Sequence, residues 1–270
     1  MYKNNDLLVC GKYYNTSDVF KINEDAQISV EEFGDQKVVV VDDFYSNPEL
    51  VRYMSLNNFA SKLNNMGYPG FKTSFYINQK MNVRWYTDVI DDVYRKEEPI
   101  NFVPYYDTID RIDFNLVKSS EVYNWNYDIP NKACHPHIDM NEKNIKYGAV
   151  VYLNTEDEYT AGVNGTAFYK HINTNVIDCN WRIQKHYRQS GYPVIDDVFY
   201  QSDTIHCNDW INDGNEHWEK VHLTQMKYNR LVLYPSTYFH QAYLNNDDFN
   251  DPNPATGHRI VQAIFLRGKE

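Results

Sequence analysis

Two histidines and an aspartate stand within five positions of the segment HPHID, residues 135–139. In an extended segment, residues two positions apart point to the same side, so His137 and Asp139 present an imidazole and a carboxylate together. One more histidine from a distant strand would complete a triad of two histidines and one carboxylate. Such a triad binds Fe(II) on one side and leaves positions open for a substrate and O2.

A suitable third histidine stands near the C-terminal end. His240 follows LVLYPSTYF, which we interpret as a strand, a Pro-Ser turn and the beginning of another strand. Arg259 stands at the head of the last predicted strand, HRIVQAIFL, and points to the same side as Val261. An arginine there can bind a dicarboxylate through two parallel hydrogen bonds. An iron triad and an anion-binding arginine are together what a 2-oxoglutarate-dependent oxygenase requires.

Each of these residues also has a plainer interpretation. The H-x-D pair could lie in a solvated turn, and His240 could be a core histidine bonded to a backbone carbonyl. Arg259 could form an ion pair with a surface acid such as Asp251. His135 is a rival ligand, because it also stands two positions from His137 and would give a cupin-like imidazole site. The presence of the complete residue set favours the iron site.

The elements that must position these residues change character near residue 105. Before that point the sequence predicts a buried strand at residues 38–41, a helix after Pro48, a loop at residues 67–73 and a helix over residues 83–97. After it, short strands alternate with polar turns. We expect these strands over residues 111–121, 147–155, 165–172, 229–236, 238–245 and 258–268.

This pattern predicts a mainly β protein with a single domain over residues 1–270. Residues 1–105 would form an α/β support, and residues 106–270 a sandwich or open barrel. Residues 173–226 fit the strand pattern poorly, so we interpret them as a long insertion that forms a lid. The other histidines in and beside it are interpreted as structural or surface residues: His171, His186, His206, His217 and His222.

Charge and composition argue against some classes of binding partner and some cellular compartments. The formal net charge of −11 would repel a nucleic-acid backbone, so nucleic acid is not an expected partner. No apolar run is long enough to cross a bilayer, and the first residues lack the layout of a secretory signal. The four cysteines form no C-x-x-C pair, which argues against a disulfide framework or a zinc ribbon. We therefore expect a cytoplasmic protein with a small-molecule or peptide substrate.

The ordered segments HPHIDM, YGAVVYLNT, GTAFY, LVLYPSTYFHQA and HRIVQAIFL resemble the Fe(II)/2-oxoglutarate oxygenases of the prolyl-hydroxylase-like group. The resemblance covers about residues 110–266, and VVVVDDFYSNPELVR resembles the N-terminal entry to that fold. It implies a double-stranded β-helix, a jelly roll with cupin-like architecture, supported by N-terminal helices. The metal would lie in the mouth of the jelly roll.

The resemblance also implies roles for the residues singled out above. His137, Asp139 and His240 would be the metal ligands and so the catalytic centre. The implied activity is that of a dioxygenase, a hydroxylase acting on a peptide, an amino-acid side chain or another small organic molecule. Fe(II) would be the cofactor, with O2 and 2-oxoglutarate as cosubstrates.

Three residues would bind 2-oxoglutarate by the same resemblance. Arg259 would hold the distal carboxylate, and Tyr152 matches a tyrosine that hydrogen-bonds this group in some relatives. Thr166 would line the pocket. The sequence departs from the usual family pattern at AGVNGT, which lacks the double glycine, and at Val261, where many relatives carry serine or threonine.

Two functions from other classes are alternatives. One is a non-catalytic jelly-roll binding module, which would be expected to have lost one residue of the set. The other is a cupin-type metalloenzyme that uses His135 and needs no 2-oxoglutarate. An assay for turnover of 2-oxoglutarate would distinguish the oxygenase from these two alternatives.

Overall fold

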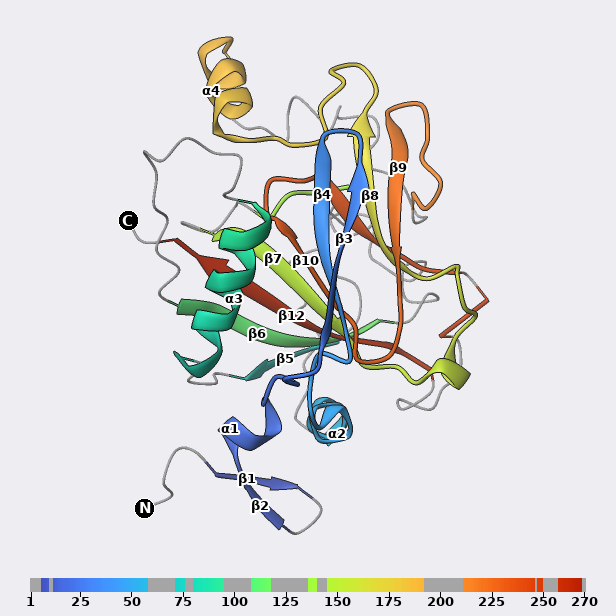
Figure 1. Ribbon diagram of the computed structural model, residues 1–270. Helices are drawn as coiled ribbons and strands as arrows, with labels where there is room; N and C mark the ends of the chain where they lie inside the picture. The colour runs from blue at the N-terminus through green and yellow to red at the C-terminus, as the bar shows by residue number, and fades with distance from the viewer. Residues whose placement is uncertain are drawn as a thin grey trace.

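The computed structural model is mainly β, with two antiparallel sheets that carry the residues of interest (Figure 1). A separate hairpin, β1 (Asp6–Val9) with β2 (Lys12–Asn15), precedes these sheets. The structure describes residues 6–9, 12–57, 71–75, 80–94, 108–117, 136–139, 145–191, 211–245, 247–249 and 257–268.

The larger sheet has seven strands and combines segments from both ends of the chain. The C-terminal strand lies inside it rather than at an edge, between two strands that precede it in the sequence. The order across the sheet is β3 (Gln27–Phe33), β4 (Gln36–Asp42), β10 (Leu231–Pro235), β7 (Ile145–Tyr152), β12 (Arg259–Arg267), β6 (Thr108–Val117) and β5 (Phe71–Phe75).

The smaller sheet has three strands, in the order β11 (His240–Tyr243), β8 (Gly165–His171) and β9 (Trp218–Gln225). An isolated bridge joins His137 to the first residue of β11. The segment at residues 136–139 therefore continues this sheet beyond β11. In this way the H-x-D segment and His240 become neighbours although they are far apart in the sequence.

Helices α2 (Pro48–Asn57) and α3 (Lys80–Val93) pack on one face of the larger sheet. Proline suits the first position of α2, where its missing N–H would have no partner within the helix. Two short elements are α1 (Thr16–Val19) and the 3-10 helix η4 (Glu156–Glu158). None of the helices that the structure describes is long and apolar enough to cross a membrane. The buried cluster between helices and sheet includes Val39, Val41, Val51, Met54, Tyr86, Ile90, Ala149, Val151, Leu233 and Ile264.

The other face of the larger sheet packs against the smaller sheet. Because side chains alternate along a strand, Val40 points to this interior whereas Val39 and Val41 point to the helices. This explains why residues 38–41 form an unbroken apolar run, since both faces of β4 are covered. The cluster between the sheets is rich in aromatic rings and includes Phe33, Tyr152, Phe168, Val232, Tyr234, Tyr238 and Val261.

The outer face of the smaller sheet packs against described residues of the connection between β8 and β9. Helix α4 (Trp181–Gln189) lies in this connection, and the side chain of Asn180 caps it by accepting from the backbone N–H groups of Arg182 and Ile183. The third buried cluster, on this side, contains Ala167, Tyr169, Cys179, Ile211, Trp218 and Phe239.

Most of the expected strands are present, and the expected N-terminal helices support the sheet. Two predictions were wrong. Residues 173–226 are not wholly an insertion, because residues 218–225 form β9; as an edge strand with partly exposed residues on both faces, β9 lacks clear alternation. The predicted loop at residues 67–73 overlaps β5, which begins at Phe71 and pairs with β6.

Candidate metal centre

Backbone hydrogen bonds place the H-x-D segment beside β11. The N–H of His137 donates to the carbonyl of His240 at 2.9 Å, and the N–H of His240 donates back at 3.0 Å. The N–H of Asp139 donates to the carbonyl of Ser236 at 2.9 Å. Because the segment is extended, both of its functional side chains point to the same side, as the spacing predicted.

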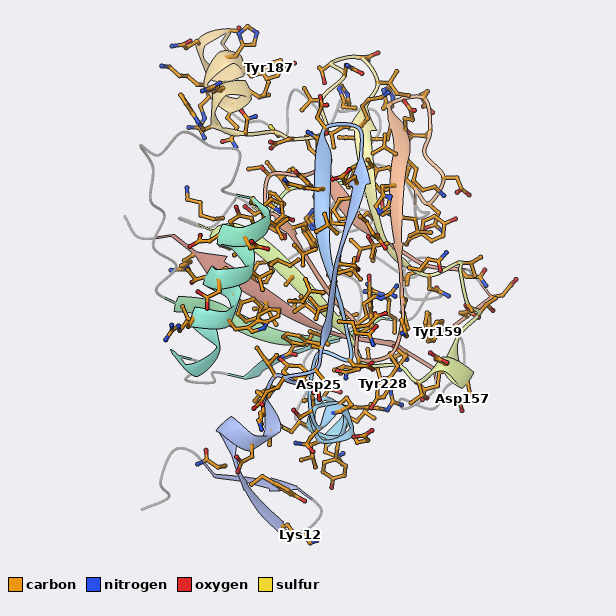
Figure 2. The ribbon with its side chains drawn as sticks, viewed as in Figure 1. Lys12, Asp25, Asp157, Tyr159, Tyr187 and Tyr228 are labelled. Carbon is orange, nitrogen blue, oxygen red and sulfur yellow. The ribbon has the colours of Figure 1, made fainter. Side chains whose placement is uncertain are left out.

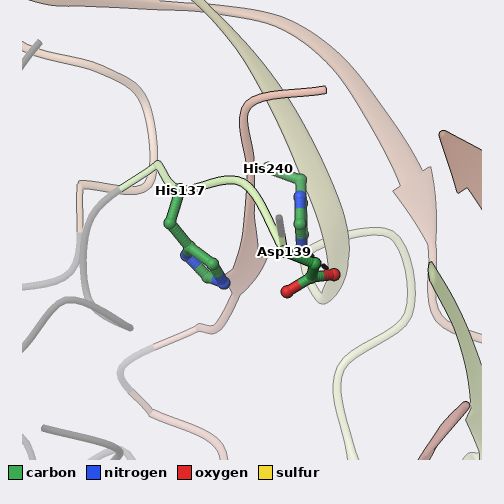
Figure 3. Close-up of side chains that lie close together, drawn as sticks. All are labelled: His137, Asp139 and His240. Carbon is green, nitrogen blue, oxygen red and sulfur yellow. Dashed lines mark ion pairs between the residues drawn. The ribbon is translucent and has the colours of Figure 1, made fainter. Parts of the chain in front are cut away.

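The side chains of His137, Asp139 and His240 converge (Figure 3). One ligand atom from each lies within 4.8 Å of the other two. Nε2 of His240 is 3.3 Å from Oδ2 of Asp139, and the two imidazole centroids are 4.7 Å apart. Metal bonds to histidine nitrogen and carboxylate oxygen are about 2.0–2.2 Å long, so atoms bound to one ion lie at most about 4.4 Å apart, and small side-chain rotations would bring these three atoms around one ion. Within the described ranges, no other group of three such residues has this arrangement.

The ring of His240 is oriented for metal binding through Nε2. Its Nδ1 lies 2.9 Å from the carbonyl of Tyr238, which can only accept, so Nδ1 carries the proton. Burial lowers the pKa of His240, but the neighbouring Asp139 carboxylate and the Tyr238 carbonyl outweigh it and raise the pKa above its ordinary value. A cation is therefore favoured at Nε2, whether it is a proton or a metal ion.

Gly148 on β7 leaves the space that the Asp139 carboxylate occupies. A Cβ at this position would lie 2.9 Å from Oδ2 of Asp139 and 3.2 Å from Cε2 of Tyr234. The sequence analysis did not single out Gly148 or Tyr234. A glycine inside a strand was the available signal, because glycine there often marks the close approach of another group.

Arg259 is buried at the head of β12, with 4% of its surface exposed. Its Nη2 lies 3.5 Å from the carbonyl of Gly165, and its Cζ lies 5.5 Å from the ring centre of Tyr152. Its Nε is buried without a hydrogen-bond partner. Among the residues described, no carboxylate forms an ion pair with it; Asp251, the alternative partner, lies outside the described residues.

Tyr152 and Thr166 lie beside this arginine. The Tyr152 hydroxyl is 2.6 Å from Oγ1 of Thr166, and both side chains are buried. Burial raises the pKa of Tyr152, although the charge of Arg259 opposes this, so the phenol stays protonated and can donate. The three residues expected at the 2-oxoglutarate site are thus brought together.

The triad and the arginine group face the same interior between the two sheets. Gly148 and Tyr152 lie on one face of β7, four residues apart, which is about 13 Å along a strand. Tyr234 on β10 lies between the two groups, with its ring centroid 4.6 Å from that of His240. Burial raises the pKa of Tyr234, and the charge of Asp139 raises it further. Its hydroxyl therefore remains a hydrogen-bond donor.

Two of the other described histidines, His171 and His222, have contacts that need no metal. His171 lies 2.8 Å from the hydroxyl of Thr174, and His222 lies 2.8 Å from a carboxylate oxygen of Glu31. His186 is exposed on α4. His135, the rival ligand, lies outside the described residues, as does His206.

A protein-family model described as "Family of unknown function (DUF6445)" matches residues 24–266. The matched range contains the triad, Arg259 and the strands of the two sheets, apart from the last residue of β12. No curated protein matches the chain.

Proposed function

We propose that this chain, which belongs to the DUF6445 family of unknown function, is an Fe(II)- and 2-oxoglutarate-dependent dioxygenase. Its substrate would be a peptide or amino-acid side chain, or another small organic molecule, that becomes hydroxylated. Because no activity is assigned to the family, the proposal rests on the residues of the site.

The buried guanidinium of Arg259 carries the proposal. A buried charge is costly unless a partner of opposite charge compensates it. Arg259 has neighbours in Tyr152 and Gly165 but no carboxylate partner within the described residues, and its Nε is left without an acceptor. An anionic ligand at this position would remove the cost. A keto acid with a second carboxylate would satisfy the arginine at one end and reach the triad at the other.

The donor set fits Fe(II). Two imidazoles and one carboxylate on one side of an ion leave open positions for a chelating cosubstrate and O2. The arrangement of strands supports a double-stranded β-helix, because β6, β7, β10 and β12 enter one sheet while the His137 segment, β8, β9 and β11 enter the other. Such alternation between facing sheets is expected of a jelly roll.

When bound, Fe(II) and 2-oxoglutarate would supply the oxidising chemistry: O2 and the keto acid are consumed, one oxygen atom enters the substrate, and succinate and CO2 are released. The residues of the chain would position the reactants. His137, Asp139 and His240 would hold the metal from one side only.

The remaining site residues would bind the keto acid and exclude water. Arg259 would hold the distal carboxylate, and the Tyr152 hydroxyl would donate to the same group. The Tyr234 hydroxyl would donate a hydrogen bond to the keto acid, in the space between the distal carboxylate and the metal. The ring of Phe168, which packs against Tyr234 at 5.3 Å between centroids, would keep this space dry.

An anaerobic titration of the apoprotein, with Fe(II) and then 2-oxoglutarate, tests the proposal. Chelation of Fe(II) by the keto acid produces a visible charge-transfer band. We expect this band in the wild type, its loss in His137→Ala, and a need for far more keto acid in Arg259→Ala. His186→Ala, which removes an exposed imidazole from α4, should leave the band unchanged.

Folded protein that binds iron without developing the band would contradict the proposal. It would favour the cupin-type metalloenzyme or the binding module instead. If the band appears, admission of O2 should release succinate, and succinate release then identifies substrates by their stimulation of it.

A further inference from the structure

Helix α4 exposes basic and aromatic side chains on an otherwise acidic protein. Its sequence, WRIQKHYRQ, contains Arg182, Lys185 and Arg188 and no acidic residue, whereas the chain as a whole has a formal net charge of −11. The helix lies at the top of the molecule in Figure 1, and Figure 2 labels Tyr187 on it. Trp181, its first residue, is 64% exposed.

Within the described residues, no carboxylate neutralises the cations of α4. Among the described residues, none of these three cations forms an ion pair, whereas Lys170 pairs with Glu219 and Lys220 with Asp213. All three are exposed. The helix therefore offers positive charge that the rest of the described chain leaves available.

Backbone pairing joins the base of α4 to the segment that leads into His240. Residues 177–179, directly before its cap, pair with residues 237–239, which lead into His240. The buried side chain of Gln184 donates from Nε2 to the carbonyl of Cys179 at 2.7 Å and holds the first turn of the helix to this base. A ligand on α4 is thus held in a fixed relation to the triad.

A surface cavity of about 410 Å³ lies along the helix. Its lining residues all belong to α4, so it is an open hollow on one face of the helix rather than an enclosed pocket. The ring of Trp181 and the cationic groups of Lys185 and Arg188 lie on the same side of the helix. The residues that line the cavity are Trp181, Gln184, Lys185, Arg188 and Gln189.

We propose that α4 and this cavity form a docking surface for an acidic peptide segment, with carboxylates on Lys185 and Arg188 and an apolar group against Trp181. The role of this surface rests on the proposed function: the segment would belong to the substrate, outside the residue that becomes hydroxylated. Binding of such a remote segment would orient the reacting residue at the metal.

Charge favours a peptide over an extended polyanion. A nucleic acid or an anionic membrane would meet the negative field of the whole molecule beyond the helix, which opposes its approach. A short segment with a few carboxylates meets only the local cations. Exposed tryptophan and arginine are also the residues that most often dominate the energy of a protein–peptide contact.

Fluorescence anisotropy with labelled peptides on the metal-free protein tests the docking surface. We expect a short peptide of alternating Glu and Gly to bind, and peptides with Gln or Lys in place of Glu not to bind. Lys185→Glu with Arg188→Glu should weaken binding by about tenfold or more. Lys21→Glu with Arg84→Glu changes the net charge equally at two exposed cations elsewhere and should change binding by less than about twofold.

Three outcomes would overturn the inference. These are no binding of the Glu peptide, equal weakening in the two double variants, or tighter binding of single-stranded DNA or phosphatidylserine-containing vesicles than of the peptide. Since the assay contains neither metal nor keto acid, its result is independent of the charge-transfer titration. Peptide binding without the charge-transfer band would contradict only the oxygenase proposal.

Discussion

At the triad, neighbours that bind no metal set the orientation of the ligands. The carbonyl of Tyr238 fixes the proton on Nδ1 of His240, and the carbonyl of Ser236 holds the backbone of Asp139. Gly148 leaves room for the carboxylate itself. Substitutions among these neighbours should therefore alter metal binding even though every ligand remains.

Gly148→Ala tests this at a single atom. The added Cβ would lie 2.9 Å from Oδ2 of Asp139, so the carboxylate must leave the position in which it faces the two imidazoles. We expect the affinity for Fe(II), measured by anaerobic titration, to fall by about tenfold. Gly268→Ala is the matched control, because its Cβ would meet only the flexible side chain of Lys146. Equal affinities in the two variants would contradict this account of Gly148.

At the scale of elements, one side chain fixes the beginning of β12 and so the place of Arg259. Asn154 accepts from the N–H of Ile260 at 2.6 Å and donates to the carbonyl of His258 at 2.8 Å. It holds the backbone on both sides of the arginine. The same amide also donates to Glu158 at 3.1 Å, which links β12 to the turn after β7.

Asn154→Ala should separate keto-acid binding from metal binding. We expect the free energy of unfolding to fall by about 1–3 kcal/mol, because the buried N–H of Ile260 loses its acceptor. The concentration of 2-oxoglutarate needed for the charge-transfer band should rise, while the affinity for Fe(II) alone stays unchanged. Asn212→Ala removes a similar pair of bonds, to Leu244, and should destabilise the protein without changing the keto-acid requirement.

Some strands and site residues could be predicted from the sequence, and others could not. Short apolar segments between polar turns predicted β7, β8 and β12, and the spacing of two residues placed His137 and Asp139 on one side because that relation is local. Asn154 and Gly148 could not be found in this way, since their roles arise only when β7 pairs with β12 and faces Asp139. Strand neighbours are set by packing between distant segments, which periodicity does not specify.

At the scale of the whole molecule, Glu31 links the two sheets across their edges. It projects from β3 of the larger sheet and accepts hydrogen bonds from His222, at 2.8 Å, and Thr224, at 2.7 Å, on β9 of the smaller sheet. Phe33 stacks on the ring of His222 at 4.7 Å between centroids. The hairpin of β3 and β4 thereby helps to close the interior that contains the site.

The contribution of Glu31 to stability should depend on pH. Burial raises the pKa of its carboxyl, but the hydrogen bonds from His222 and Thr224 outweigh this and lower it below 4.5. A lowered pKa stabilises the folded state above the unfolded value, and this contribution disappears as the pH falls through the folded pKa. Urea unfolding of Glu31→Gln should show a loss of about 1 kcal/mol at neutral pH that vanishes in acid.

The exposed Glu32 on the same strand provides the control for this measurement. It forms no ion pair with any described residue, so Glu32→Gln should leave the urea midpoint unchanged at both pH values. A difference between Glu31→Gln and the wild type that persists undiminished below the folded pKa would contradict the electrostatic explanation.

The position of β12 inside the larger sheet has a consequence for folding. During synthesis β6 and β7 emerge well before the strand that separates them, and β4 emerges long before its partner β10. Until β10 has been synthesised, β4 has one unpaired edge. Its apolar residues 38–41 are then exposed to aggregation. Only after the last strand emerges can the sheet close and bring Arg259 opposite the triad. Premature termination a few residues before β12 would leave the facing edges of β6 and β7 unpaired and would remove Arg259, so we expect an aggregating chain rather than a partly active one.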